Sequence, residues 1–152
     1  MNRKITPENI TKLADNEIFV FGSNLSGRHG KGAAKTALGW GAKWGQASGL
    51  QGKTYGIPTK DASVRRTLSI KEIKPFVDEF INFAKEHSEM NFLVTEIGCG
   101  LAGYKAKDIA PLFKSVEGLE NVYLPEKFWH KISQKETIIE IMKSDEELGL
   151  YN

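Results

Sequence analysis

Two glycine-rich segments contain the residues whose types and spacing could support ligand chemistry. Of the 15 glycines, 10 lie between Gly22 and Gly56, and three lie between Gly98 and Gly103. Glycine permits positive φ and lets a ligand lie directly against the main chain. Backbone N–H groups in such loops, and at the start of a following helix, bind anions without needing a basic protein. We therefore expect the two segments to hold an anion such as a diphosphate.

The first segment, FGSNLSGRHGKGAA, runs from Phe21 to Ala34. Its candidate catalytic residues are Asn24 and His29, because either could orient a water molecule. A neutral imidazole could also act as an acid or a base, or donate a hydrogen bond to a phosphate. His29 could equally make only a structural hydrogen bond within the loop. The expected ligand contacts of this segment are Gly22, Ser23, Leu25, Gly27, Gly30, Gly32 and Ala33.

The second segment, EIGCGLAGY, begins at Glu96. Glu96 is the third candidate catalytic residue, since a carboxylate there could activate water or bind ribose hydroxyls, or could simply pair with a Lys or Arg. A thiol among backbone amides could have a lowered pKa and act as a nucleophile. No base partner for Cys99 is visible, so we favour a space-filling role. The expected ligand contacts are Gly98, Cys99, Gly100, Leu101, Ala102, Gly103 and Tyr104, with Tyr104 packing on a sugar or base.

Neither segment matches a well-known phosphate-binding motif. The stretch from Gly27 to Gly32 lacks the Gly-Lys-Ser/Thr ending of GxxxxGK[ST], and neither segment gives GxGxxG with an acidic residue about 20 positions later. These absences disfavour a nucleoside triphosphatase and a Rossmann dehydrogenase. A glycine-rich loop after a strand can also be no more than a tight turn, and that alternative stays open.

Strands and helices must position both segments. Short apolar runs bounded by Gly or Pro predict strands over residues 17–21, 53–57, 91–97 and 121–124. Capping residues and helical spacing predict helices over residues 6–14 with Thr6 as N-cap, for about three turns from His29, over 70–84 with Ser69 as N-cap and Pro75 inside, over 107–113, and from Pro125. Alternating strands and helices predict an α/β sheet covered on both faces. Both glycine segments begin where a strand ends, which is where such sheets place ligands.

Two further pairs of residues are candidates for a place in the site. Trp40 and Trp44 lie four residues apart, so we expect them to stack on one helical face and cover the core; a platform for adenine is the alternative. Lys60 and Asp61 follow the second predicted strand, and we expect them to form a solvated turn that Asp61 caps.

The composition bounds the class of protein. A length of 152 residues suits a single domain over 1–152, and a net charge of +2 gives no global field that favours nucleic acid. One cysteine and three scattered histidines cannot form a disulfide or a metal framework, and we expect no cofactor. Neither a signal peptide nor a membrane span is visible, so we expect a cytoplasmic protein without a membrane partner. Residues 134–152 could add an amphipathic C-terminal helix.

The glycine segments together resemble the macro domain. In that family a strand is followed by Asn and a glycine-rich loop, and a later strand runs into a Gly-Thr-Gly-x-x-Gly-Tyr/Phe loop. Here the matching stretches are Gly22-Ser-Asn-Leu25 and Ile97-Gly-Cys-Gly-Leu-Ala-Gly-Tyr104. The stretch from about Thr6 to Trp129 is most similar to a poorly characterised bacterial and phage group of macro-like proteins, some of them labelled non-structural. The resemblance implies a three-layer α/β/α fold with a mixed central sheet.

The resemblance also implies a ligand. Residue by residue, it places Asn24 near the distal ribose of ADP-ribose, and it places the two glycine segments around the diphosphate. The adenine-contacting aspartate of the family has no clear match in this sequence. We therefore expect ADP-ribose or a related NAD-derived nucleotide, or an ADP-ribosylated substrate, as the partner. The alternatives are hydrolysis of an ADP-ribosyl linkage, a non-catalytic nucleotide-binding module, or an interaction protein whose glycine loops are only turns.

Overall fold

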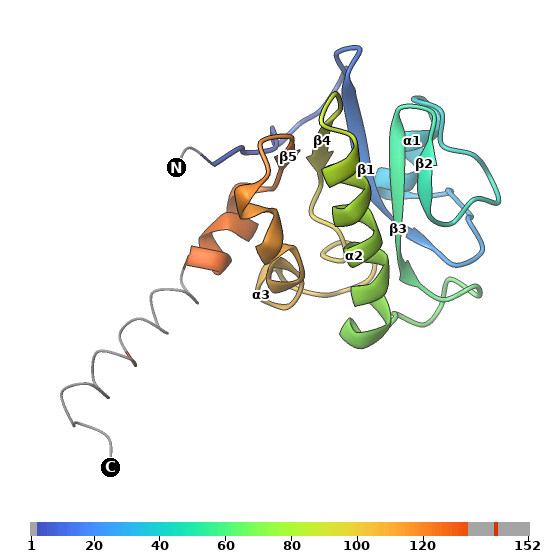
Figure 1. Ribbon diagram of the computed structural model, residues 1–152. Coiled ribbons are helices and arrows are strands. Elements are labelled where there is room, and N and C mark those ends of the chain that lie inside the picture. Colours follow the sequence, from blue (N-terminus) through green and yellow to red (C-terminus); the bar gives the residue numbers. More distant parts are fainter. Residues whose placement is uncertain (1–2, 134–141, 143–152) are drawn as a thin grey trace.

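A five-stranded mixed sheet forms the centre of the computed structural model, which describes residues 3–133 and residue 142 (Figure 1). Its strand order is β2-β3-β1-β4-β5. The strands are β1 (Glu17–Asn24), β2 (Gly49–Gln51), β3 (Thr54–Lys60), β4 (Asn91–Val94) and β5 (Val122–Tyr123). β1 is parallel to β3 and β4, β4 is parallel to β5, and only β2 is antiparallel to its neighbour. The carboxyl ends of β1, β3 and β4 therefore meet at one edge of the sheet.

The continuous apolar run in β1 divides between two cores. Ile18 and Val20 belong to the larger core, while Phe19 and Phe21 belong to a smaller one. Successive side chains of a strand point to opposite faces, so a central strand covered on both sides must be apolar at every position. The prediction of a strand buried on both faces is confirmed here.

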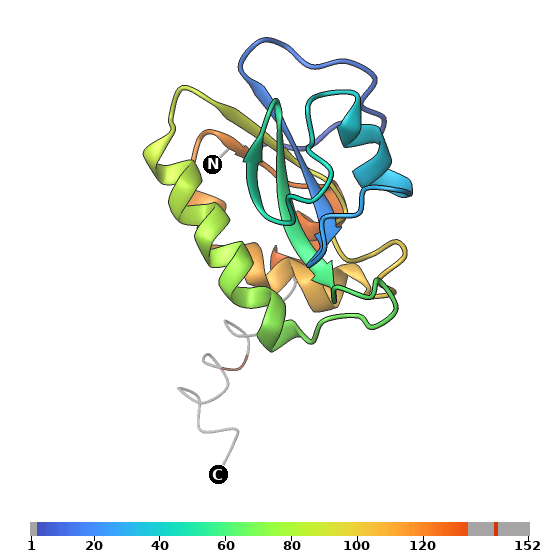
Figure 2. The same cartoon turned by 90° about the vertical axis from the view of Figure 1, so that its right-hand side faces the viewer.

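Helices cover both faces of this sheet, as Figure 2 shows in side view. The larger core packs under α2 (Ile70–Glu86), α3 (Ala106–Ile109), the 3₁₀ helix η1 (Ala110–Gly118) and the helical residues 126–133. The smaller core packs under α1 (Gly32–Leu38). The predicted α/β class with a mixed sheet is confirmed.

Helix α2 begins as its sequence predicts. The hydroxyl of Ser69 accepts a hydrogen bond from the Glu72 N–H, and the Glu72 carboxylate accepts one from the Ser69 N–H. This reciprocal capping box satisfies two otherwise unpaired donors at the helix start. Pro75 lies inside the helix rather than at its first turn. The buried face consists of Ile73, Val77, Phe80, Ile81 and Ala84.

The predicted helix over residues 6–14 is wrong, because this segment is not helical. The Thr6 N–H donates to the carbonyl of Leu124 at 2.9 Å, and the Leu124 N–H donates to the carbonyl of Lys4 at 3.1 Å. Ile5 and Leu124 form a parallel bridge. The backbone of Thr6 thus extends the sheet beyond β5, so it cannot serve as an N-cap.

The first glycine segment leads into a shorter helix than expected. α1 has seven residues and ends at Leu38, about two turns rather than the predicted three. Beyond it, Gly41 and Gly52 lie in direct backbone contact, since a Cβ on Gly52 would stand 2.6 Å from the Gly41 Cα. The chain therefore turns back into β2, a three-residue strand that the sequence did not predict.

The remaining boundaries differ by a few residues from those expected. β3 continues through Pro58 to Lys60 rather than ending before the proline, because β2 pairs only with Thr54–Gly56 and needs no donor from Pro58. β4 ends at Val94, and the helix expected over 107–113 is α3 followed by η1. The helix expected in the tail lies outside the described residues. Among the described helices, none has the length and apolar character needed to cross a bilayer.

Candidate functional site

The two glycine segments come together around one cavity of about 660 Å³, which we call the loop cavity. It lies beyond the carboxyl ends of β1, β3 and β4, where open α/β sheets bind ligands. The first segment contributes residues 22–24, 28 and 30–34, and the second contributes 96–98 and 100–102. Trp44, Thr59, Lys60, Val64 and Thr95 complete the wall. The structure thus brings together two segments that are distant in the sequence.

Gly30 and Gly100 leave the main chain open to the loop cavity. A Cβ at either position would meet nothing within 4 Å, although both residues line the cavity. Within the described residues, the backbone N–H groups of Gly30, Lys31, Gly100 and Leu101 donate to no protein acceptor. Unpaired amides beside open space can hydrogen-bond an anionic oxygen. Because α1 has only seven residues, these loop amides rather than a helix dipole are the available anion donors.

Other glycines of the two segments serve packing. Gly27 has a φ of 69°, and a Cβ there would stand 2.4 Å from the carbonyl carbon of Gly45. Gly98 has a φ of 77°, and its Cβ would stand 3.0 Å from Cδ1 of Ile109. Gly27 and Gly103 do not line the loop cavity. For these positions the requirement for glycine comes from turn geometry and close approach.

Basic side chains dominate the charge of the loop cavity. Arg28, Lys31 and Lys60 line it, and within the described residues none of them forms an ion pair. Glu96 is the single carboxylate of the lining. Opposite charges attract more strongly in a recess than in open water, so this lining favours an anionic ligand. The sequence led us to expect Lys60 only in a solvated turn, whereas the structure places it in the cavity wall.

The turn after β3 brings Lys60 to the cavity. As expected, Asp61 belongs to a turn: its carboxylate accepts hydrogen bonds from the Ser63 hydroxyl and the Arg66 N–H, which lower its pKa. Val64 has a φ of 63°, a strained value for a β-branched residue. Its N–H donates to the Asp61 carbonyl at 3.0 Å, and its carbonyl lies 3.5 Å from Nζ of Lys60. The turn therefore anchors the lysine near the cavity wall.

Asn24 lines the loop cavity but uses its side chain to shape the loop. Its Nδ2 donates to the Arg28 carbonyl at 2.7 Å, and its Oδ1 accepts from the Arg28 N–H and the Ser26 hydroxyl, each at 2.9 Å. Ser23 is also buried and donates to the carbonyl of Ala47. Leu25 is 42% exposed and does not line the cavity.

His29 lies beneath the first segment rather than in the cavity. The ring is fully buried, and its Nε2 lies 2.9 Å from the carbonyl of Lys43 and 3.1 Å from that of Gln46. Since both partners are acceptors, Nε2 carries the proton. Nδ1 is buried and has no partner within the described chain. The geometry gives His29 the structural role that the sequence left open, because the ring does not reach a ligand in the cavity.

Trp44 does not cover the core, and that expectation is wrong. α1 ends at Leu38, so Trp40 and Trp44 do not share a helical face. Trp40 packs on Phe19 with ring centroids 5.0 Å apart. Trp44 is instead 64% exposed and lines the loop cavity, with its ring at 77° to that of His29.

The second glycine segment presents Glu96 and Leu101 to the loop cavity. Glu96 is half exposed, and one carboxylate oxygen lies 3.4 Å from Nζ of Lys127. Leu101 is 67% exposed. Tyr104 turns the other way: its ring packs against the larger core, and its hydroxyl donates to the Leu68 carbonyl at 2.7 Å. Tyr104 is therefore not available to pack on a sugar in this structure.

Cys99 has the environment of a packing residue. Burial, with contributions from the nearby Glu96 and Asp108 carboxylates, raises the pKa of its thiol to about 11. Its Sγ contacts the Ile97 carbonyl at 3.5 Å, and the side chain packs against the larger core. A thiol with a raised pKa is a poor nucleophile at neutral pH. The space-filling role that the sequence favoured agrees with this environment.

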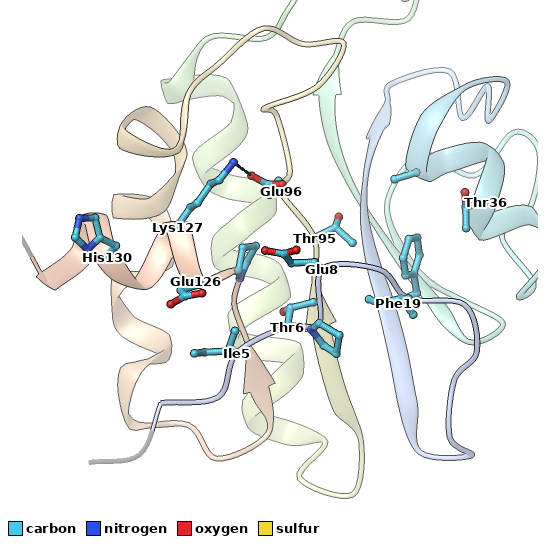
Figure 3. Close-up of a pocket in the computed structure, with 14 residues that line it drawn as sticks. Ile5, Thr6, Glu8, Phe19, Thr36, Thr95, Glu96, Glu126, Lys127 and His130 are labelled. Atoms are coloured by element: carbon cyan, nitrogen blue, oxygen red, sulfur yellow. Dashed lines mark ion pairs between the residues drawn. The ribbon is translucent and has the colours of Figure 1, made fainter.

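A second cavity of about 830 Å³, which we call the acidic cavity, is drawn in Figure 3 and shares lining residues with the first. Its apolar wall consists of Ile5, Pro7, Ile10, Phe19 and Pro125. Its carboxylates are Glu8, Glu96 and Glu126, and Figure 3 shows Lys127 extending toward Glu96. The acidic cavity was not predicted, because the segment that forms much of its wall was expected to be helical.

The two cavities share Ala33, Thr95 and Glu96. Thr6 also lines the acidic cavity, and its buried Oγ1 has no hydrogen-bond partner within the described chain. A buried hydroxyl without a partner is costly, so a ligand group that bonds to it would be stabilised.

Among residues 3–133 and 142, no group of His, Cys, Asp and Glu side chains is arranged to hold a metal ion.

Comparison with models of known protein families, with curated proteins and with solved structures finds no match for this chain.

Proposed function

We propose that this protein is a macro-like domain that binds ADP-ribose or a related NAD-derived nucleotide, with the diphosphate in the loop cavity and the base in the acidic cavity. The observation that carries the proposal is the shared wall of Ala33, Thr95 and Glu96 between two cavities of opposite character. Each cavity has a volume in the range usual for small-molecule sites. One ligand with an anionic middle and a planar base would therefore occupy both.

The diphosphate fits the loop cavity by charge and by hydrogen bonding. Arg28, Lys31 and Lys60 supply positive charge, and the free amides at Gly30 and Gly100 supply directed donors. The absence of a Cβ at these two glycines lets phosphate oxygens approach the backbone. Arginine guanidinium and backbone amides are the usual partners of phosphate in proteins.

The base fits the acidic cavity because this cavity offers both an apolar surface and hydrogen-bond acceptors. An adenine ring offers apolar faces to Phe19 and the prolines, and its exocyclic amine offers hydrogens to a carboxylate such as Glu8. Thr6 Oγ1 supplies one more polar partner. We therefore assign the contact to adenine, which had no match in the sequence, to the segment around Thr6 and Glu8.

A hydrolytic activity is the second candidate, and it would depend on Glu96. Of the three candidate catalytic residues, His29 is buried away from the cavity, and the Asn24 side chain is occupied by Arg28 and Ser26. Glu96 alone combines exposure with a place between the two cavities. A carboxylate there could accept a proton from the attacking water.

Calorimetry with ADP-ribose tests the binding proposal. We expect saturable binding by the unmodified chain, and we expect Gly100→Glu to abolish it, because the new side chain puts bulk and negative charge into the loop cavity. Gly118→Glu is the matched control, since it adds the same side chain at a position where a Cβ also meets nothing within 4 Å but which lines neither cavity. Absence of binding at millimolar ADP-ribose would refute the proposal and leave the interaction-protein alternative.

A second assay separates an enzyme from a binding module. The chain is incubated with mono-ADP-ribosylated protein, and free ADP-ribose is measured. If the chain is an enzyme, it releases free ADP-ribose, and the Glu96→Gln variant loses this activity but keeps its affinity for the ligand. A binding module leaves the linkage intact while still retaining the modified protein.

A further inference from the structure

Trp44 is exposed at the rim of the loop cavity although its surroundings are fixed. The Gly45 N–H donates to the Gly27 carbonyl at 2.9 Å, and the Lys43 N–H donates to Oε1 of Gln51 at 2.7 Å. The residues on both sides of Trp44 are thus tied to other segments, yet its side chain is 64% exposed. An indole this exposed gains little from folding. Its position is therefore explained better by a ligand than by the core.

The indole is also backed by buried rings. His29 stands edge-on to Trp44 with centroids 6.4 Å apart, and Phe21 stands edge-on to His29 at 5.3 Å. Both supporting rings are fully buried. This ladder of rings leads from the core to the cavity rim, so the platform is held in place before a ligand arrives. A rigid platform loses little conformational entropy on binding.

The location of Trp44 suggests which part of a ligand it meets. Trp44 and the exposed Leu101 line the loop cavity but not the acidic cavity. A ligand whose base fills the acidic cavity and whose diphosphate spans the glycine segments therefore extends its far end toward this apolar rim. A ribose can place only a few C–H groups on an indole face, whereas a planar heterocycle stacks its whole π face on it, so the exposed indole favours a heterocycle.

We propose that Trp44 is the platform for a second planar nitrogen heterocycle carried on the distal ribose, so that the preferred ligand is a dinucleotide rather than ADP-ribose itself. This inference rests on the function proposed above and adds the class of ligand. Stacking on an exposed aromatic side chain is tolerant of ring identity, because every base has a π face. The ring could be a charged nicotinamide or a neutral nucleobase, and both present the same chemistry to the indole.

The test compares ligands that differ only in that ring. Calorimetry is carried out on the full chain with ADP-ribose, with NAD⁺, which adds a charged nicotinamide, and with diadenosine diphosphate, which adds a neutral adenine. We expect at least one dinucleotide to bind about tenfold more tightly than ADP-ribose. A preference for NAD⁺ alone would indicate a cationic ring, and equal gains would indicate stacking without regard to charge.

Variants at Trp44 locate the effect. Trp44→Ala is expected to lower dinucleotide affinity about tenfold more than it lowers ADP-ribose affinity, so that the preference disappears, and Trp44→Phe is expected to keep most of the preference. Leu50→Ala is the control, because Leu50 is also exposed and apolar but lines neither cavity. Thermal unfolding establishes that each variant is folded.

The outcomes distinguish this inference from the function on which it rests. Equal affinity for all three ligands, or a dinucleotide preference that survives in Trp44→Ala, overturns the role of Trp44 while the nucleotide site stands. Failure of all three ligands to bind refutes the proposed function and this inference together.

Discussion

The Asn24 carboxamide closes the first glycine segment by bonding both backbone groups of Arg28. Its Nδ2 donates to the Arg28 carbonyl at 2.7 Å, and its Oδ1 accepts from the Arg28 N–H at 2.9 Å. Asn24 ends β1, so the sheet directly fixes the loop that carries Arg28 to the cavity. The residue that resemblance places at the ribose is also the residue that holds the loop in shape.

This pairing predicts a loss of stability on substitution of Asn24. Asn24→Ala leaves the N–H and carbonyl of Arg28 unpaired and is expected to cost about 1–3 kcal/mol. Urea denaturation measures the cost. Asn24→Asp keeps the acceptor and loses the donor, so it is expected to be intermediate. A variant as stable as the parent chain would mean that water replaces both bonds.

Gly27 and Gly30 are expected to respond in opposite ways to alanine. Gly27→Ala places a Cβ against the backbone of Gly45 at a positive φ, and we expect a loss of more than about 2 kcal/mol. Gly30→Ala projects into open space and is expected to change stability by less than about 0.5 kcal/mol while weakening ADP-ribose binding. Thermal melts and calorimetry on both variants check this. The reverse ranking would contradict the division between packing and ligand-facing glycines.

Lys60 is expected to contribute to anion affinity. Lys60→Gln removes a cation from the loop cavity, and we expect about tenfold weaker binding of ADP-ribose at low salt. Arg65→Gln is the matched control, because Arg65 is exposed nearby but does not line the cavity. The difference in ADP-ribose affinity between Lys60→Gln and the parent chain should become smaller as the NaCl concentration is raised, since salt screens charge. Equal losses in both variants would indicate a general effect of net charge.

Cys99 is expected to resist alkylation when the protein is folded. Burial raises the pKa of its thiol to about 11, so the thiolate is scarce at pH 8. Iodoacetamide should therefore react more slowly with the folded chain than with the chain in urea. The pKa of this thiol is raised in the folded state from the free value of 9.0 to about 11. Its contribution to folding stability is therefore complete below pH 9 and is lost as the pH rises toward 11. Equal alkylation rates in both states would rule out the raised pKa.

Much of the fold could be predicted from local signals. The apolar run in β1 and the Ser69 capping box are complete within a few residues, so periodicity and capping rules identify them. The convergence of both glycine segments on one cavity followed from the rule that parallel strands end at a common edge. These features needed no knowledge of distant contacts.

The errors concern contacts made far along the chain. Thr6 has the sequence of an N-cap, but pairing with Leu124 determines its backbone. His29 and Tyr104 both have side chains suited to ligands, and hydrogen bonds to the carbonyls of Lys43 and Leu68 draw them inward. The exposure of Trp44 could have been predicted only by recognising that the glycines after Leu38 end α1 before it reaches Trp44. No local pattern contains these tertiary preferences.

The wall between the cavities has a consequence for ligand length. Ala33 is the smallest of the three residues that the loop cavity and the acidic cavity have in common. A larger residue at this position, such as leucine, would act as a partition: each compartment could still accept its own fragment, but a ligand that spans both would be shut out. On the proposed function, the small side chain of Ala33 leaves room for one ligand to extend from one cavity into the other.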